Sequence, residues 1–137
     1  MTQRQILDLV GQGGSSLELE CLSVKYTFHF NCNPQLANDQ TVFEVGRNDV
    51  GIPIVVDPNV GNIYFWNAGK LSFINSSFNQ MLEAFRLINE WGIPDDLPDA
   101  ARTGLFTSRM LENDPNCFCN PEACWSMVRE EMGYGVI

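Results

Sequence analysis

The chain has 137 residues, of which 45% are hydrophobic and 18% charged, a composition typical of one soluble globular domain that needs no disulfide or metal staples. Its 17 acidic and 8 basic residues leave a formal net charge of -9, which disfavours direct binding of nucleic acid and favours a basic partner. No apolar run approaches the roughly 18 residues that a membrane span needs, and the N-terminus lacks the apolar core of a signal peptide, so we expect a single cytoplasmic domain over residues 1–137.

The first third of the chain predicts a short helix and then antiparallel strands. Residues 2–10 have the helical period, and the glycines that follow would end the helix. Residues 16–22 alternate apolar and polar side chains, as a strand with one wet face does, and residues 24–30 repeat the pattern with aromatic side chains. Residues 31–40 have the composition of a turn, so we predict a loop there, and residues 41–45 return to a strand pattern.

Three more strands are predicted to form a meander. Residues 51–57 are apolar at both odd and even positions, which suits an inner strand that is covered on both faces. Pro53 limits this strand to starting there or to lying at the edge of the sheet. The turn-forming sequence DPNVG separates this strand from an apolar strand over residues 62–67. A second turn at Gly69 and Lys70 leads into the last strand.

The stretch from residue 72 to residue 85 changes from a strand period to a helical one. Ser77 is a favourable N-cap, and Gln80 stands at the capping-box spacing, where the hydroxyl and the amide each satisfy a backbone N–H. The predicted helix, residues 77–91, carries two adjacent apolar stripes. The first is Phe78, Met81, Leu82, Phe85 and Ile88, and the second is Ala84, Leu87 and Trp91. So wide an apolar surface must be covered from two sides, by the sheet and by later helices.

Two further helices are predicted in the last third of the chain. Residues 100–114 have a moderate helical propensity, which Gly104 weakens. In the last helix Asn120 is the predicted N-cap, Pro121 the first helical residue and Gly133 the end. The chain is therefore predicted to be an α+β protein, in which a mixed, largely antiparallel sheet packs against C-terminal helices.

Three of the five cysteines, Cys117, Cys119 and Cys124, cluster in the sequence CFCNPEAC. An odd number of cysteines without an export signal argues against a disulfide framework. Structural zinc sites usually pair their ligands at C-x₂₋₄-C, whereas here a C-x-C is followed by four residues and then by Cys124 inside the predicted helix, and no second clean pair exists. A fourth ligand would have to come from one of three residues: Cys21, Cys32 or His29. We expect free thiols and no bound metal; the alternative function is a small metal- or ligand-binding domain that uses the three clustered cysteines.

No pattern of catalytic residues stands out. His29 is the only histidine, and it lies on a predicted strand between two phenylalanines, where a structural role is usual. The sequence GQGGSS lacks the last glycine of a dinucleotide-binding loop, and AGKL lacks most of a P-loop. Adjacent acids such as Asp95 and Asp96 fall on a predicted loop, where carboxylates are solvated. The sequence therefore disfavours an enzyme, and we assign no catalytic residue and no cofactor.

Three segments occur in a characteristic order after residue 42. They are GIPIVVDPNVGNIYFWN at residues 51–67, FINSSFNQMLEAFRL at residues 73–87, and ENDPNCF followed by EACWSMV within residues 112–128. Together they resemble the SUKH superfamily, specifically its fourth family of bacterial immunity proteins. The resemblance is clearest from about residue 42 to 137 and covers about two thirds of the chain. It implies a SUKH-like domain and a cytoplasmic protein that neutralises a cognate polymorphic toxin, often a nuclease or deaminase, and it brings no catalytic residues.

A toxin that acts on nucleic acid needs positive charge, so an acidic inhibitor would gain encounter rate and specificity. From Glu83 onward the chain has ten acids and four bases, against seven acids and four bases before it. We predict that Asp95, Asp96 and Asp99 contact the toxin and that Trp91, if exposed, supplies an apolar anchor. The alternative is that this acidity only keeps the protein soluble.

Overall fold

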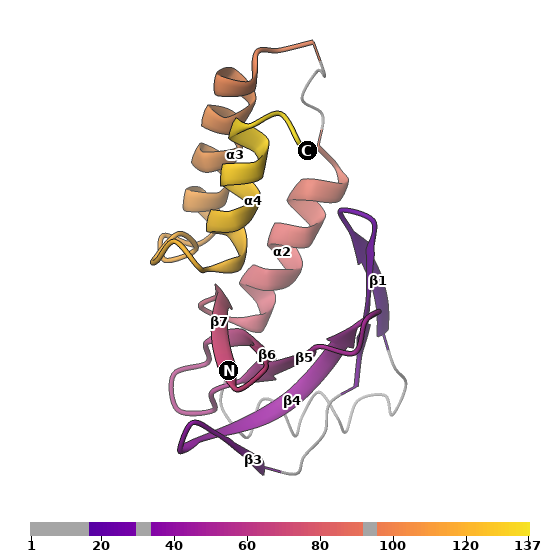
Figure 1. The fold of residues 1–137 in the computed structure, drawn as a ribbon, viewed down its shortest axis with the longest axis vertical. Coiled ribbons are helices and arrows are strands. Elements are labelled where there is room, and N and C mark those ends of the chain that lie inside the picture. The colour runs from indigo at the N-terminus through magenta and orange to yellow at the C-terminus, as the bar shows by residue number, and fades with distance from the viewer. Residues whose placement is uncertain (1–16, 30–33, 92–95) are drawn as a thin grey trace.

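A computed structural model of the chain describes residues 17–29, 34–91 and 96–137. In these residues a seven-stranded antiparallel sheet packs against three helices, so the predicted α+β class is confirmed (Figure 1). Helix α2 (Phe78–Asn89) lies between the sheet and the pair formed by α3 (Asp99–Asn113) and α4 (Cys124–Gly133). No helix in the described ranges has the length and apolar character to cross a membrane. The predicted helix over residues 2–10 lies outside the described residues.

The sheet runs in the order β1-β2-β4-β5-β6-β7, and β3 pairs with β4 outside that path. The strands are β1 (Leu17–Cys21), β2 (Val24–Phe28), β3 (Pro34–Ala37), β4 (Gln40–Asn48), β5 (Pro53–Val56), β6 (Ile63–Asn67) and β7 (Lys70–Asn75). Every pairing is antiparallel. The two early strands and the later three-strand meander are therefore confirmed, with β5 starting at Pro53 as predicted and β4 longer than predicted.

The loop predicted over residues 31–40 is wrong at Pro34–Ala37, which forms β3 and makes a hairpin with β4. Asn38 and Asp39 make the two-residue turn, with positive φ angles of 51° and 65°. Asn and Asp tolerate this left-handed backbone, so the polar residues make one tight turn between strands instead of a long loop. Pro34 stands at the first position of its strand, where the missing N–H is tolerated.

The main core lies between the sheet and α2. The ring of Phe78 meets Phe28 of β2 edge-on with centroids 5.5 Å apart, and the ring of Phe85 lies 4.9 Å from that of Tyr26. Met81 is also fully buried on this helix. The first predicted stripe of α2 thus packs on the sheet, where burial of its large side chains stabilises the fold.

The later helices cover the other side of α2. The ring of Phe85 lies 5.9 Å from that of Trp125 on α4, and Phe106 and Met110 of α3 belong to the same core. Residues 77–91 therefore have the two-sided cover that the wide apolar surface predicts. A second, smaller core on the opposite face of the sheet buries Val55, so β5 is covered on both faces, as predicted.

The starts of α2 and α4 differ in how well the sequence predicts them. At α2 the Oγ of Ser77 accepts a hydrogen bond of 3.1 Å from the backbone N–H of Gln80, which confirms the N-cap. The Gln80 side chain accepts from the Ser77 hydroxyl and donates to the carbonyl of Asn113, so it ties α2 to the end of α3. At α4 the predicted N-cap is wrong: the helix begins at Cys124, and Asn120 accepts from the N–H of Glu122 in a turn before it.

Candidate functional site

A buried hydrogen-bond network joins segments that lie far apart in the sequence. Asp114 is fully buried and accepts hydrogen bonds from the Ser76 N–H and hydroxyl, both at 2.8 Å. It also accepts from the Asn75 amide at 2.9 Å and from the Asn116 N–H at 3.1 Å. The Asn75 Oδ1 in turn accepts from the Trp125 indole at 2.9 Å. A buried carboxylate with four donors holds β7, the end of α3 and α4 in one place, which is a structural task rather than a catalytic one.

The buried carboxylate of Glu44 is shared by His29 and Arg47. The Nε2 of His29 lies 2.5 Å from Oε2, and the Arg47 Nη2 donates to Oε1 at 2.8 Å. Burial alone would raise the pKa of Glu44, but the hydrogen bonds from Arg47 and His29 outweigh it and hold that pKa below its usual value. Among the described residues, no Ser, Thr or Cys side chain hydrogen-bonds to His29, so this pair has no nucleophile to activate there.

The Glu44 cluster predicts an acid-dependent loss of stability. Because the pKa of Glu44 is lower in the folded protein than its ordinary value near 4.5, the ionised carboxylate stabilises the fold at pH values above 4.5. This stabilisation is lost as the pH falls through the pKa of the folded state. At neutral pH we expect Glu44→Gln to lower the free energy of unfolding by about 1–2 kcal/mol. Urea denaturation over an acid pH series should show that the difference between variant and wild type shrinks as the pH falls. A difference that stays constant to acid pH would contradict the ion-pair role.

The thiols do not form a metal centre in the part of the chain that the structure describes, where no three His, Cys, Asp or Glu side chains could share an ion. Cys117 is buried, Cys119 exposed and Cys124 half-buried, so the three thiols lie in different environments. Burial raises the pKa of Cys117 to about 12, and burial together with nearby Cys21 does the same for Cys124. Such thiols stay protonated at neutral pH and are poor nucleophiles. Cys32 lies outside the described residues.

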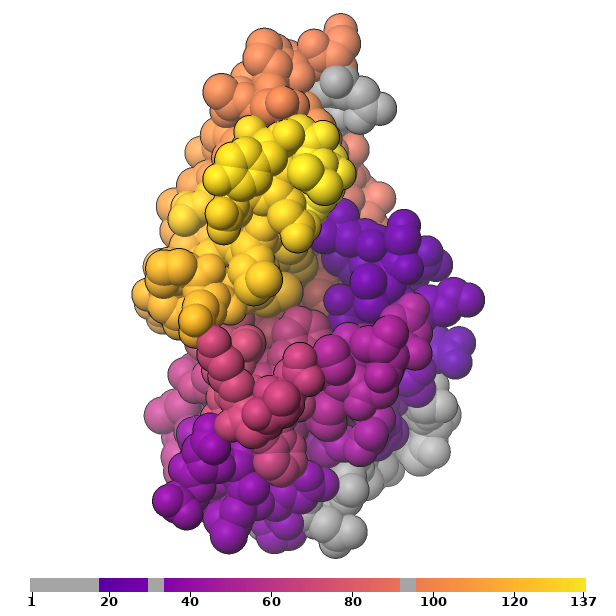
Figure 2. All heavy atoms as spheres, viewed as in Figure 1, coloured from indigo at the N-terminus to yellow at the C-terminus, as the bar shows by residue number. Residues whose placement is uncertain are grey.

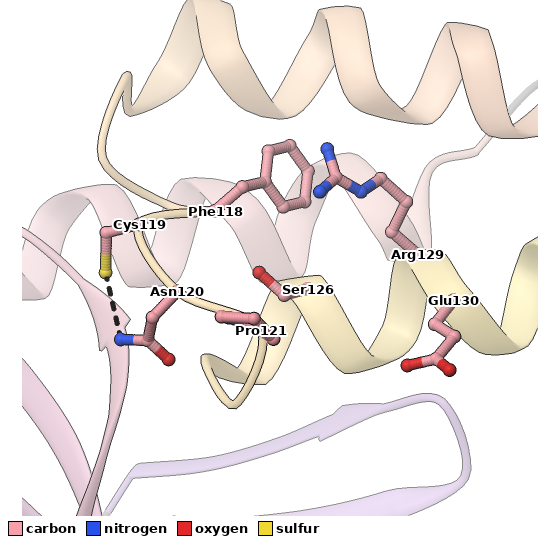
Figure 3. Close-up of a pocket in the computed structure, with 7 residues that line it drawn as sticks. All are labelled: Phe118, Cys119, Asn120, Pro121, Ser126, Arg129 and Glu130. Atoms are coloured by element: carbon pink, nitrogen blue, oxygen red, sulfur yellow. Dashed lines mark hydrogen bonds between the residues drawn. The ribbon is translucent and has the colours of Figure 1, made fainter.

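A shallow pocket of about 380 Å³ opens beside the first turns of α4 (Figure 3). The Arg129 guanidinium stacks over the Phe118 ring, 4.0 Å from its centre. Ser126 is buried, and its hydroxyl has no hydrogen-bond partner among the described residues. Glu130 is exposed at the rim and, like the other described residues, makes no hydrogen bond to that hydroxyl. We assign this pocket no chemistry.

A larger groove of about 520 Å³ separates α4 from the helix-facing side of the sheet. In Figure 2 it lies on the face shown, below the yellow helix α4. Half-buried Phe65 of β6 and Val128 of α4 line it, together with Met127, whose exposed fraction is 52%. A salt bridge of 2.6 Å between Lys70 and Glu122 crosses its rim. The sequence gives no signal for the groove, which exists only because β6 and α4 come together.

The predicted partner-binding residues differ in their exposure. Asp96 and Asp99 are exposed, whereas Asp95 lies outside the described residues. Trp91 is half-buried: the Arg109 guanidinium lies 5.2 Å from its ring centre, and the Phe106 ring lies 5.9 Å away. Part of the Trp91 surface is therefore already used inside the protein. Their role in binding stays a prediction.

No family model matches this chain, and no curated protein or solved structure is similar to it. The resemblance to SUKH immunity proteins therefore rests on the three sequence segments.

Proposed function

We propose that this protein is a cytoplasmic immunity protein of the SUKH type that binds and neutralises a cognate toxin, of the nuclease or deaminase kind, by protein–protein contact. The observation that supports this proposal most is the buried network. Asn75 and Ser76 come from the second segment of the resemblance, and Asp114 and Trp125 come from the third. If the chain shares the fold of the proteins it resembles, the residues that carry the resemblance are expected to meet inside the fold, as these residues do in the buried network.

The surface charge supports a basic partner. The net charge is -9, and Asp96 and Asp99 are exposed near the start of α3. An acidic inhibitor and a basic nucleic-acid enzyme attract one another over about a Debye length, which raises the association rate. In this proposal the acids steer the encounter and apolar contacts supply the affinity.

The proposal predicts a salt-sensitive complex. The probe is the C-terminal domain encoded by the neighbouring reading frame, in a catalytically inactive form. We expect the two proteins to co-elute on gel filtration, with an association rate that falls roughly tenfold or more between low and physiological salt. Replacing Asp95, Asp96 and Asp99 by Asn should slow association further at low salt and leave the melting temperature nearly unchanged.

A matched control removes the same charge elsewhere. The triple variant Glu18→Gln, Glu20→Gln and Asp39→Asn changes three exposed carboxylates on β1 and in the β3–β4 turn. It should slow association less than the Asp95, Asp96 and Asp99 variant. Equal effects of the two variants would mean that only net charge matters, and absence of any complex would contradict the proposed function.

A further inference from the structure

We propose, on the basis of the proposed function, that the groove between α4 and the sheet is the anchor site for the toxin. It would receive an apolar side chain of the partner, and its acidic rim would pair with a Lys or Arg beside that side chain. The groove would thus supply the affinity that the acidic surface alone does not.

The groove has the size and lining of a site for a large apolar side chain. Its volume of about 520 Å³ falls within the usual range for binding clefts. Phe65, Ile52 and Val128 line it and are half-buried, so each keeps apolar surface that a partner could cover. Met127 stands 52% exposed beside them, and its flexible thioether can adapt to the shape of a partner. Burial of such apolar surface against a partner excludes water and makes the free energy of binding more favourable.

The charges at the groove favour a cation. Glu122 lines it from the turn before α4 and Glu131 from α4 itself, and Glu122 already pairs with Lys70. Glu131 is exposed and has no ion-pair partner among the described residues. The only base on α4, Arg129, stacks over Phe118 and does not line the groove. A partner cation that reaches Glu131 would therefore find a carboxylate that makes no ion pair among the described residues, since Lys70 of the groove pairs with Glu122.

The same charges disfavour a second copy of this chain as the occupant. Each copy carries a net charge of -9, so two acidic grooves brought together would repel. The predicted steering acids also lie toward this helix: a Cβ added at Gly135, just after α4, would come within 2.9 Å of the Asp99 carboxylate. Asp99 thus lies beside the C-terminal end of α4, the helix that carries Glu131 of the groove.

The test compares variants of the groove with matched variants of α3, using the inactive C-terminal domain of the neighbouring reading frame as the probe. Met127→Glu and Glu131→Lys change exposed side chains at the groove. Leu105→Glu and Glu112→Lys make the same kinds of change on exposed positions of α3. We expect each groove variant to raise Kd at least tenfold and each α3 variant to change it less than about threefold, with all melting temperatures close to wild type.

The outcomes separate the two proposals. If the wild-type complex forms and both groove variants bind as tightly as wild type, the groove is not the anchor site and the immunity function stands. If the wild type forms no complex, the proposed function fails and the groove proposal fails with it. If the protein alone elutes as a dimer that Met127→Glu dissociates, the groove binds a second copy, and the proposal is also wrong.

Discussion

Replacing Asp114 by Ala should lower the free energy of unfolding by about 3–5 kcal/mol, a large part of the ~5–15 kcal/mol that stabilises a domain. The change removes the acceptor for the Asn75 amide, for the Ser76 hydroxyl and N–H, and for the Asn116 N–H, and Asn75 and Asp114 are both fully buried. A buried donor without an acceptor carries its full desolvation cost, and four donors are affected together. The loss of this junction should also loosen the contact between β7 and α4.

Urea denaturation at neutral pH measures this effect directly. Asp96→Ala is the control, because Asp96 is exposed and should change stability little. Near-ultraviolet circular dichroism should show a changed Trp125 environment in the Asp114 variant, since the indole is bonded to Asn75. A loss below about 1 kcal/mol would mean that water or local rearrangement satisfies the donors that Asp114 now accepts from.

Phe85→Ala should destabilise the protein by a similar amount, about 3–5 kcal/mol, and lower its melting temperature by roughly 10 °C or more. Phe85 is 3% exposed and lies between Tyr26 of the sheet and Trp125 of α4. Truncation therefore leaves a cavity at the point where the sheet, α2 and α4 meet, and the surrounding rings can fill it only in part. Leu105→Ala on α3, at an exposed position, is the control and should melt close to wild type. An unchanged melt for Phe85→Ala would mean that this face of α2 contributes little to the core.

Local sequence patterns predict much of this fold because the helical period and helix capping depend only on residues a few positions apart. Phe78 and Phe85 recur at the helical period, and Ser77 caps the helix through a bond to a residue three positions on. The same local reasoning fails at β3, where turn residues occupy two positions of a hairpin instead of a loop. It also fails at Asn120, whose side chain bonds to Glu122 as an N-cap would, although α4 begins only after that turn.

The candidate sites depend on contacts across long stretches of sequence, which local patterns do not encode. Asp114 and Asn75 are 39 residues apart and meet only when α3 and β7 are in place. Trp91 fits the pattern of an exposed anchor until Arg109 and Phe106 of α3 come against it. The groove likewise needs β6 and α4 side by side. A sequence pattern can therefore name a surface acid such as Asp99, but it cannot say which apolar residues lie next to it.

The measurement that tests the immunity function most directly is survival of bacteria that express the active toxin of the neighbouring reading frame. We expect cells with the toxin alone to stop growing and cells that also express this protein to grow normally. The Phe85→Ala variant, if it fails to fold, should lose protection, whereas Leu105→Ala should keep it. If the wild-type protein is expressed and folded but gives no protection against that toxin, the function proposed here is wrong.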